Sequence, residues 1–361
     1  MRGSRRAQLA EHWRIIRAIA AKDILDAIRN RTTLSIILGV GLVMLSGLAL
    51  PLVLGARAGP ACVVYDPHRS ALLRPLGLRP VASLEEIKST VATSLQPVLG
   101  IVIPPEFGEA QGAGQTITLE GYVPHWASRS QVARLVSTFE ADLGRASGQT
   151  VRIDVQGRRV YPSAEQANQP SVLGMNLTLQ ILIVGLSLVP LLIMEEKETH
   201  TFDALLVSPA RLAHVVTGKA LAGLFYCLCG VAVVFLFSAR WLVHWDIALL
   251  GAFLGAVFAV GAGLLLGAVC DNPSTLNLWV LVAVMALLGP GLAVGLVHAG
   301  LPAWLRAVAP YTPSVAMTRL VGLSTAGAVP AADVARNAVI LTSEAFVLYI
   351  LVALRVGQTD R

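Results

Sequence analysis

Residues 172–194 are VLGMNLTLQILIVGLSLVPLLIM, a run of 23 residues in which no side chain is charged. A helix needs about 20 predominantly apolar residues to cross roughly 30 Å of hydrocarbon. Runs of the same character lie near 33–55, 213–239, 247–269, 277–298 and 335–355. The sequence therefore predicts an α-helical polytopic membrane protein with six transmembrane helices.

The composition agrees with this interpretation. Only 14% of the 361 residues are charged and 55% are hydrophobic, whereas soluble proteins carry about 25% charged residues. This excludes a soluble enzyme. The run at 33–55 starts too far from Met1 to be a signal peptide, so we expect a retained span. The segment 299–334 is broken by prolines, and we expect it to be re-entrant or interfacial.

Residues 56–171 are more polar and predict a folded domain between the first and second spans. Alternation and helical spacing predict strands at 61–65, 98–103, 116–122 and 151–155, and helices at 83–95 and 128–143. Ser83 and Glu86 have the spacing of a capping box. The second helix has its apolar residues on one face: Val132, Leu135, Val136, Phe139 and Leu143. The order β-α-β-β-α-β predicts a mixed α/β domain.

The N-terminal residues 1–31 are basic, with eight Lys or Arg. One helical face would carry Trp13, Ile16, Ala20, Ile24 and Ala27, while Arg14, Lys22 and Arg29 would lie on the others. This pattern favours an amphipathic helix in the membrane interface; the alternative is an ordinary solvated helix.

The positive charges predict the orientation. Besides the basic N-terminus, one side of the membrane receives Lys197, Arg211, Lys219, Arg355 and Arg361. The short loops on the other side have fewer: Arg240, Arg306, Arg319 and Arg336. Because cytoplasmic loops carry the excess of Lys and Arg, we expect both termini, including the tail 356–361, in the cytoplasm. The α/β domain would then be extracytoplasmic.

The cytoplasmic segment 195–212 has an unusual composition. Acidic residues cluster at Glu195, Glu196 and Glu198, where bases would be expected next to the membrane. A short helical stretch follows, with Phe202, Leu205 and Leu206 on one face, and Pro209 stops it. Such exposed apolar anchors are what a groove in another protein binds; the alternative is a solvated loop.

This segment resembles the cytoplasmic loop of type-2 ATP-binding-cassette (ABC-2) exporter permeases. The resemblance is carried by Glu196-Lys197-Glu198, Ser208-Pro209 and Gly218-Lys219. The sequence departs from the family at His200-Thr201-Phe202-Asp203, where the family has Gly-Thr-Leu-Glu. The departure keeps a hydroxyl, an apolar residue and an acid in the same order.

Three other segments resemble the same family in the same order. Residues 22–31 resemble its interfacial elbow helix, for which the implied residues are Trp13, Lys22, Asp23, Arg29 and Arg31. Residues 98–107 resemble a strand and turn in the outer domain of its large-domain branch, which includes sodium-efflux-like and drug-export-like permeases. Pro310-Tyr311-Thr312-Pro313 with Arg319 resembles the segment before its last span.

The resemblance implies an exporter built from two six-span subunits, identical or homologous, in the bacterial cytoplasmic membrane. Two cytoplasmic ATPase subunits would bind ATP and magnesium, and this chain would bind no cofactor. The segment 195–212 would couple the ATPases to the spans. The coupling residues implied are Glu195, Glu196, Lys197, Glu198, Thr199, Phe202, Leu205, Leu206, Ser208 and Pro209.

Other classes of function find less support. The sequence has no Gly-x-x-x-x-Gly-Lys-Ser/Thr motif, no paired Cys/His spacing and no nucleophile-elbow motif. We therefore expect no enzyme, no metal and no nucleic-acid partner. An ATPase-independent secondary transporter or channel, or a membrane sensor that uses the outer domain, remain the alternatives. The substrate is not indicated.

Glu344 lies inside the last apolar run, several residues from either end. An ionisable group at such depth is costly and faces protein or water. It would line the substrate route or pair with a base in the complex; alternatively, the span begins later and Glu344 lies at the outer interface.

Overall fold

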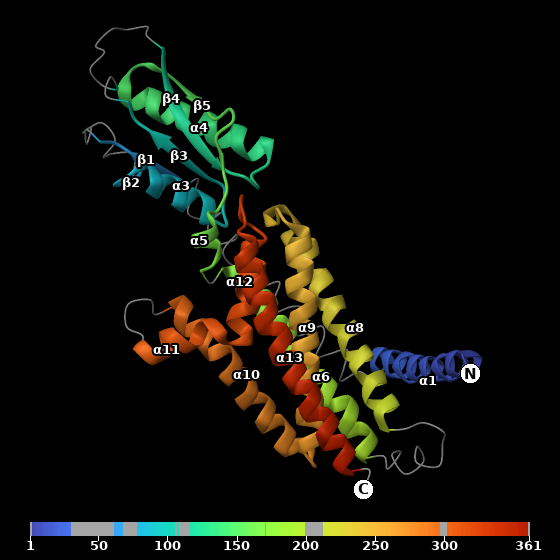
Figure 1. The fold of residues 1–361 in the computed structure, drawn as a ribbon. Helices are drawn as coiled ribbons and strands as arrows, with labels where there is room; N and C mark the ends of the chain where they lie inside the picture. The colour runs from blue at the N-terminus through green and yellow to red at the C-terminus, as the bar shows by residue number, and fades with distance from the viewer. Residues whose placement is uncertain are drawn as a thin grey trace. The chain divides into compact units, whose positions relative to one another are not determined.

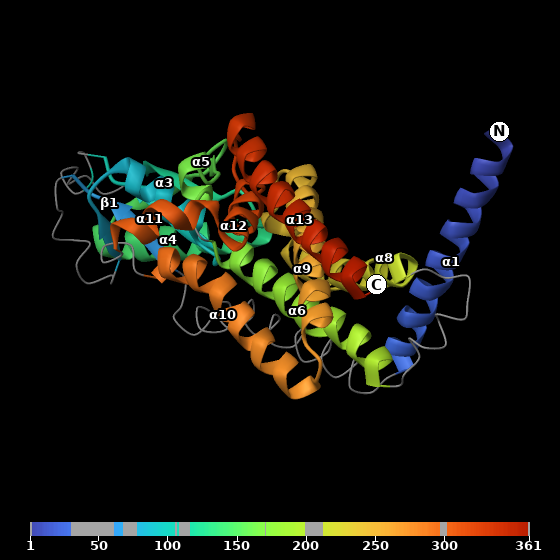
Figure 2. The ribbon, with the colours of Figure 1, turned by 60° about the horizontal axis from the view of Figure 1, so that its bottom comes forward.

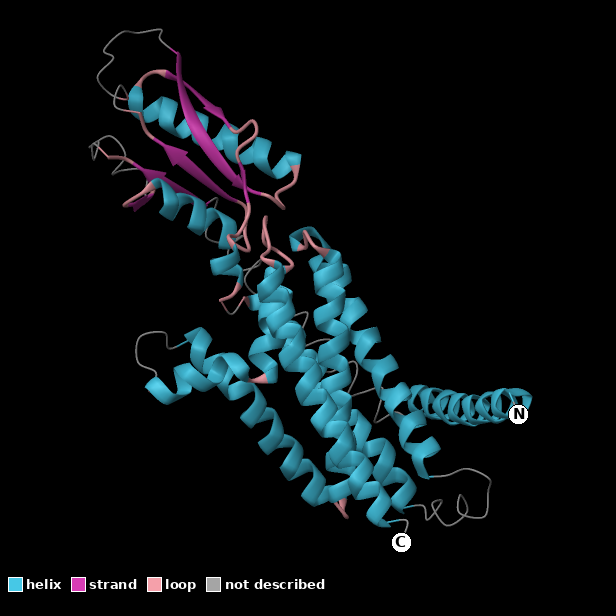
Figure 3. Ribbon diagram, in the orientation of Figure 1, coloured by secondary structure: helices cyan, strands magenta, loops and turns pink. Residues whose placement is uncertain are grey.

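A computed structural model of the chain describes residues 2–29, 61–67, 78–104, 107, 116–169, 171–198, 212–296 and 302–359. The predicted first span, 33–55, lies outside these residues. The chain forms two compact units. The strands belong to the first, an α/β unit formed largely by residues 61–167, and the second is a helical unit (Figure 3).

The α/β unit contains every element predicted for it, together with three short ones. Its elements are β1 (Ala61–Tyr65), β2 (Arg79–Val81), α3 (Leu84–Thr93), β3 (Val98–Val102), β4 (Thr116–Pro124), α4 (Arg129–Ser147), β5 (Thr150–Asp154), β6 (Arg159–Val160) and α5 (Ala164–Ala167). The elements β2, β6 and α5 were not predicted, and each is no longer than four residues. The predicted mixed α/β architecture is confirmed.

The sheet has the order β2-β1-β3-β4-β5, with β6 paired to β4. Strands β1 and β3 are parallel, as are β4 and β5, whereas β3 and β4 are antiparallel. The strands of the first βαβ unit, β1 and β3, therefore run antiparallel to those of the second, β4 and β5. In both units the second strand lies on the same side of the first in the sheet order. Right-handed crossovers place their helices on opposite faces, and α3 and α4 do cover opposite faces (Figure 1).

The predicted apolar face of α4 forms one side of the core. Leu135, Phe139 and Leu143 are buried against strand residues that include Leu99 and Leu119. The smaller core on the other face of the sheet is made by α3, through residues such as Ile87 and Val91. Alternating side chains of one sheet therefore serve two cores.

The α3 cap differs in one bond from the predicted capping box. Ser83 Oγ accepts the N–H of Glu86 at 3.1 Å, as predicted, but the Glu86 carboxylate accepts the N–H of Ala82. A complete box, with both reciprocal bonds, forms instead at the start of α4, between Ser128 and Gln131. Both caps satisfy N–H groups that have no partner within the helix.

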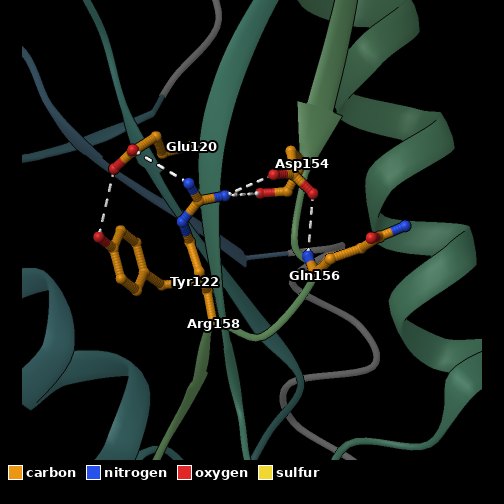
Figure 4. Close-up of polar contacts among 5 residues, drawn as sticks. All are labelled: Glu120, Tyr122, Asp154, Gln156 and Arg158. Atoms are coloured by element: carbon orange, nitrogen blue, oxygen red, sulfur yellow. Dashed lines mark hydrogen bonds and ion pairs between the residues drawn. The ribbon is translucent and has the colours of Figure 1, made fainter.

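Arg158 links β4 to the turn after β5 (Figure 4). Its guanidinium donates to Glu120 at 3.1 Å and to the Asp154 carboxylate at 2.8 Å. Tyr122 donates to the other oxygen of Glu120, and the Gln156 N–H donates to Asp154. These bonds lower the pKa of Asp154, chiefly through the Gln156 N–H and then through Arg158. The turn itself uses Gly157 at φ +71°, a conformation that glycine adopts without strain.

The helical unit contains the other predicted spans. Its elements are α1 (Arg2–Arg29), α6 (Val172–Glu198), α8 (Leu212–Ser238), α9 (Trp245–Val269), α10 (Pro273–Leu296), α11 (Ala303–Val308), α12 (Pro313–Leu323) and α13 (Ala331–Thr359), with 3-10 turns at Ala239–Trp241 and Ala309–Tyr311. Within the described residues, five helices are long and apolar enough to cross a membrane: α6, α8, α9, α10 and α13.

Helix α6 is the most buried of these five, and it packs against α8, α9, α10 and α12 (Figure 2). It approaches α9 closely where Gly185 lies on the backbone of Ala259. A Cβ added at Gly185 would lie 2.6 Å from the Ala259 Cβ. Small residues allow such close backbone contact, which is how helices associate in lipid.

Helix α12 occupies part of the proline-broken segment that we expected to be re-entrant or interfacial. It is buried almost throughout and packs against α6, α9, α10 and α13, and its re-entrant or interfacial placement stays a prediction. Pro313 stands at its first turn, where a missing N–H costs nothing. Thr318 of α12 meets Thr178 of α6 with their hydroxyl oxygens 3.1 Å apart.

Candidate functional site

Lys219 lies in the second turn of α8 and is only 2% exposed. Its ammonium group donates to the backbone carbonyl of Leu192 in α6 at 2.6 Å. It also forms an ion pair with Asp23 of α1, with Nζ and Oδ2 3.4 Å apart. One buried side chain thus joins three helices, and we name this arrangement the Lys219 junction.

The contact between α1 and α8 has two further supports beside Lys219. At Gly218, an added Cβ would lie 2.7 Å from Ile19 Cγ2, so only glycine lets α1 approach this closely. The Tyr226 hydroxyl donates to the carbonyl of Ile24 at 2.6 Å. Helix α1 is therefore fixed to α8 by polar bonds and by close packing.

Two histidines form another contact between α1 and α8. His12 Nδ1 and His214 Nε2 are 2.6 Å apart, and their rings are tilted by 38°. At this separation one neutral ring donates its N–H to the other. Within the described residues no group of three or more His, Cys, Asp or Glu side chains is arranged to hold a metal ion.

The end of α6 is held by the turn between α9 and α10. Lys197 donates to the carbonyl of Cys270 at 2.8 Å and lies 3.7 Å from the Asp271 carboxylate. Met194 packs with Cys270 and Leu276 in a small apolar cluster beneath it. The α6 terminus that leads into the segment 195–212 is therefore fixed to two neighbouring helices.

The structure describes some of the predicted site residues, and others lie outside the described residues. The backbone of 195–198 continues α6, with Glu195 exposed and Lys197 bonded as above. The remaining coupling residues, Thr199, Phe202, Leu205, Leu206, Ser208 and Pro209, lie outside the described residues, as does Arg31. Arg29 ends α1.

The membrane-interface face expected for α1 stays a prediction. Trp13 of that face is 62% exposed, and an adjoining face of α1 docks on α8 and includes the buried Asp23. Lys22 is exposed, as expected. The docked face is set by the Lys219 ion pair, and it contains His12, Ile19 and Asp23 at helical spacing.

Lys219, Tyr226 and the two histidines were not singled out as site residues from the sequence. One signal was available: Gly218-Lys219 was noted for its spacing, and a lysine at the start of an apolar run needs a partner. Its partner lies 196 residues away along the chain, and a single sequence does not identify such a pairing.

Glu344 lies in the middle of α13, on a groove of about 350 Å³. The groove is lined by Phe258 of α9, Pro313 of α12, and Ser343, Glu344, Val347 and Leu348 of α13. Glu344 is half-buried, and its Oε2 atom is buried with no hydrogen-bond partner among the described residues. Glu344 thus differs from Lys219, which is buried in α8 and has both an anion and a carbonyl as partners.

Comparison with known proteins assigns the family. The sequence profile of the ABC-2 family transporter proteins matches residues 80–354, which is most of the 361-residue chain. No curated protein matches the chain. The family is a membrane transport component, in keeping with the five apolar helices. The chain therefore belongs to the ABC-2 transporter family and is a multi-pass membrane permease of the ABC transporter class.

Proposed function

We propose that this chain is the permease subunit of an ATP-driven exporter that moves its substrate outward. Two ABC ATPase subunits, with ATP and magnesium bound to them, would act on a pair of permeases, identical or homologous. The chain would lie in a bacterial cytoplasmic membrane with both termini in the cytoplasm. Family membership supports the ATPase partner, and the distribution of Lys and Arg supports the orientation.

The observation that carries the proposal is the Lys219 junction. The segment 195–212 connects α6 to α8, and Lys219 bonds α8 both to α6 and to α1. We expect a displacement of this segment to reach α6, which packs against α8, α9, α10 and α12, through the bonds of the junction. Coupling in this sense needs a contiguous set of packed groups, which the junction supplies.

The test is co-purification with the ATPase encoded beside the permease, followed by transport in vesicles. In the predicted helix, Leu205→Glu with Leu206→Glu charges the apolar face, and Ala204→Glu charges the opposite one. We expect the double variant to lose ATPase binding and transport, and Ala204→Glu to keep both. If no ATPase associates, or if the double variant transports normally, the coupling proposal is wrong.

A further inference from the structure

Glu344 lies near the middle of a membrane-spanning helix. It follows Arg336 by eight residues and precedes Arg355 by eleven, which is roughly 12 Å and 16 Å along the helix axis. Arg336 is paired with Asp333 in the second turn of α13, and Arg355 is exposed near the other end. The two arginines mark the ends of a span close to the hydrocarbon thickness, so Glu344 does not lie at an interface.

The groove beside Glu344 has one ionisable group and an apolar lining. Phe258, Val347 and Leu348 are among its lining residues, and the Ser343 hydroxyl donates to the carbonyl of Ile340. Its volume of about 350 Å³ falls within the range of small-molecule sites, about 300–1,000 Å³. An ionisable group at this depth marks a functional site unless it has a structural partner, and Glu344 Oε2 has none in the described residues.

The neighbouring groups favour a cationic ligand. Glu344 is the ionisable group of the described lining, and the other described residues around it are apolar or carry a hydroxyl. A carboxylate in apolar surroundings then needs a counter-charge. The face of Phe258 can contribute to binding a cation as well.

The lining does not suit a metal ion. Hard cations take six or more oxygen ligands, and the described lining offers only the Glu344 carboxylate and the Ser343 hydroxyl. We infer that the groove binds a lipophilic organic monocation, with Glu344 as the counter-charge and the apolar lining around its body. This inference names a substrate class for the proposed exporter. Transport of such a cation rests on the proposed function, whereas its binding to the groove needs no ATPase.

The test is direct binding to the full-length chain in phosphatidylcholine nanodiscs without any ATPase. Tetraphenylphosphonium and tetraphenylborate have the same shape and opposite charge. We expect saturable binding of tetraphenylphosphonium, at one per chain, and none of tetraphenylborate. Glu344→Gln should weaken tetraphenylphosphonium binding at least tenfold and Phe258→Leu severalfold, while Glu344→Asp should stay within about threefold of the wild type.

Asp246→Asn is the matched control, because it removes an exposed carboxylate from the first turn of α9. It should leave binding unchanged. Equal binding of both ions, or unchanged binding to a folded Glu344→Gln, would overturn the inference. So would disulfide cross-linking of Glu344→Cys between two copies, since the groove would then be an interface. Binding that depends on Glu344 without ATP-driven transport would instead contradict the exporter proposal.

Discussion

The Lys219 junction and the Glu344 groove each contain an ionisable side chain in an apolar helix, and the two side chains differ in their partners. Lys219 has an anion at 3.4 Å and a carbonyl at 2.6 Å, whereas Glu344 Oε2 has no partner within the described residues. A paired charge holds helices together, because separating them would leave it unsatisfied. An unpaired one is a cost that a ligand can relieve. The first region therefore serves assembly and motion, and the second serves recognition.

Helix α9 lies between the two regions: it packs against α6 of the junction and contributes Phe258 to the groove. One face of α9 is closed against α6 by glycines such as Gly185 and Gly263. Another face carries Phe258 and opens onto the groove with α12 and α13. The same helix is thus fixed on one side and accessible on the other. A movement delivered to α6 at the junction would reach the groove through this closed contact.

The largest expected effect comes from breaking the junction. Asp23→Ala leaves the Lys219 ammonium buried without its anion, and removing one partner of a buried pair costs about 3–5 kcal/mol. The thermal unfolding midpoint of the purified chain in nanodiscs should fall accordingly. Asp23→Leu with Lys219→Met removes both charges and should recover much of the loss. A single variant as stable as the wild type would show that the pair does not hold α1.

The second effect concerns the closed face of α9. Gly185→Ala places a Cβ 2.6 Å from the Ala259 Cβ and 2.9 Å from its carbonyl carbon. Backbone atoms cannot move aside as a flexible side chain can, and overpacking typically costs about 1–3 kcal/mol. Gly289→Ala in α10 is the control, since nothing lies within 4 Å of its added Cβ. Equal unfolding midpoints for the two variants would contradict the close contact.

The third expected effect, on stability, should be small if Glu344 serves binding and Lys219 serves assembly. Glu344→Gln keeps the size of the side chain and removes a carboxylate whose Oε2 has no partner among the described residues, so the free energy of unfolding should change by less than about 1 kcal/mol. The measurement is again the unfolding midpoint, compared directly with Asp23→Ala. A loss as large as that of Asp23→Ala would mean that Glu344 is a structural group after all.

The local pattern of apolar residues in the sequence predicts much of the fold. The spacing of Leu135, Phe139 and Leu143 predicts their shared burial, because a helix has one period and one packed face. The runs of uncharged residues likewise locate α6, α8, α9, α10 and α13 within a few residues. These features depend on neighbours along the chain.

Features that depend on distant contacts were not predictable. The burial of α12 is set by α6, α9, α10 and α13, while its prolines alone suggest a broken loop. The face of α1 that docks on α8 includes Asp23, whose partner Lys219 is far away along the chain, so the apolar pattern of α1 did not identify this face. The position of Glu344 deep in the last span was predicted from the sequence. The groove beside it was not, because Phe258 and Pro313 come from two other helices.

The smallest expected effect on stability comes from ion pairs at the surface of the α/β unit. Arg158→Gln removes the bonds to Glu120 and Asp154, and exposed ion pairs contribute little because water already solvates them. The pKa of Asp154 is lowered in the fold, so its contribution is present above the ordinary carboxylate pKa and is lost as pH falls through the lowered one. Denaturant midpoints at neutral and acidic pH should therefore differ less in Arg158→Gln than in the wild type. Arg145→Gln is the control: it removes an exposed pair with Asp142 and a bond to the Ala141 carbonyl, both within α4, and should keep the wild-type difference. An unchanged difference in Arg158→Gln would mean that the Gln156 N–H alone lowers the pKa of Asp154.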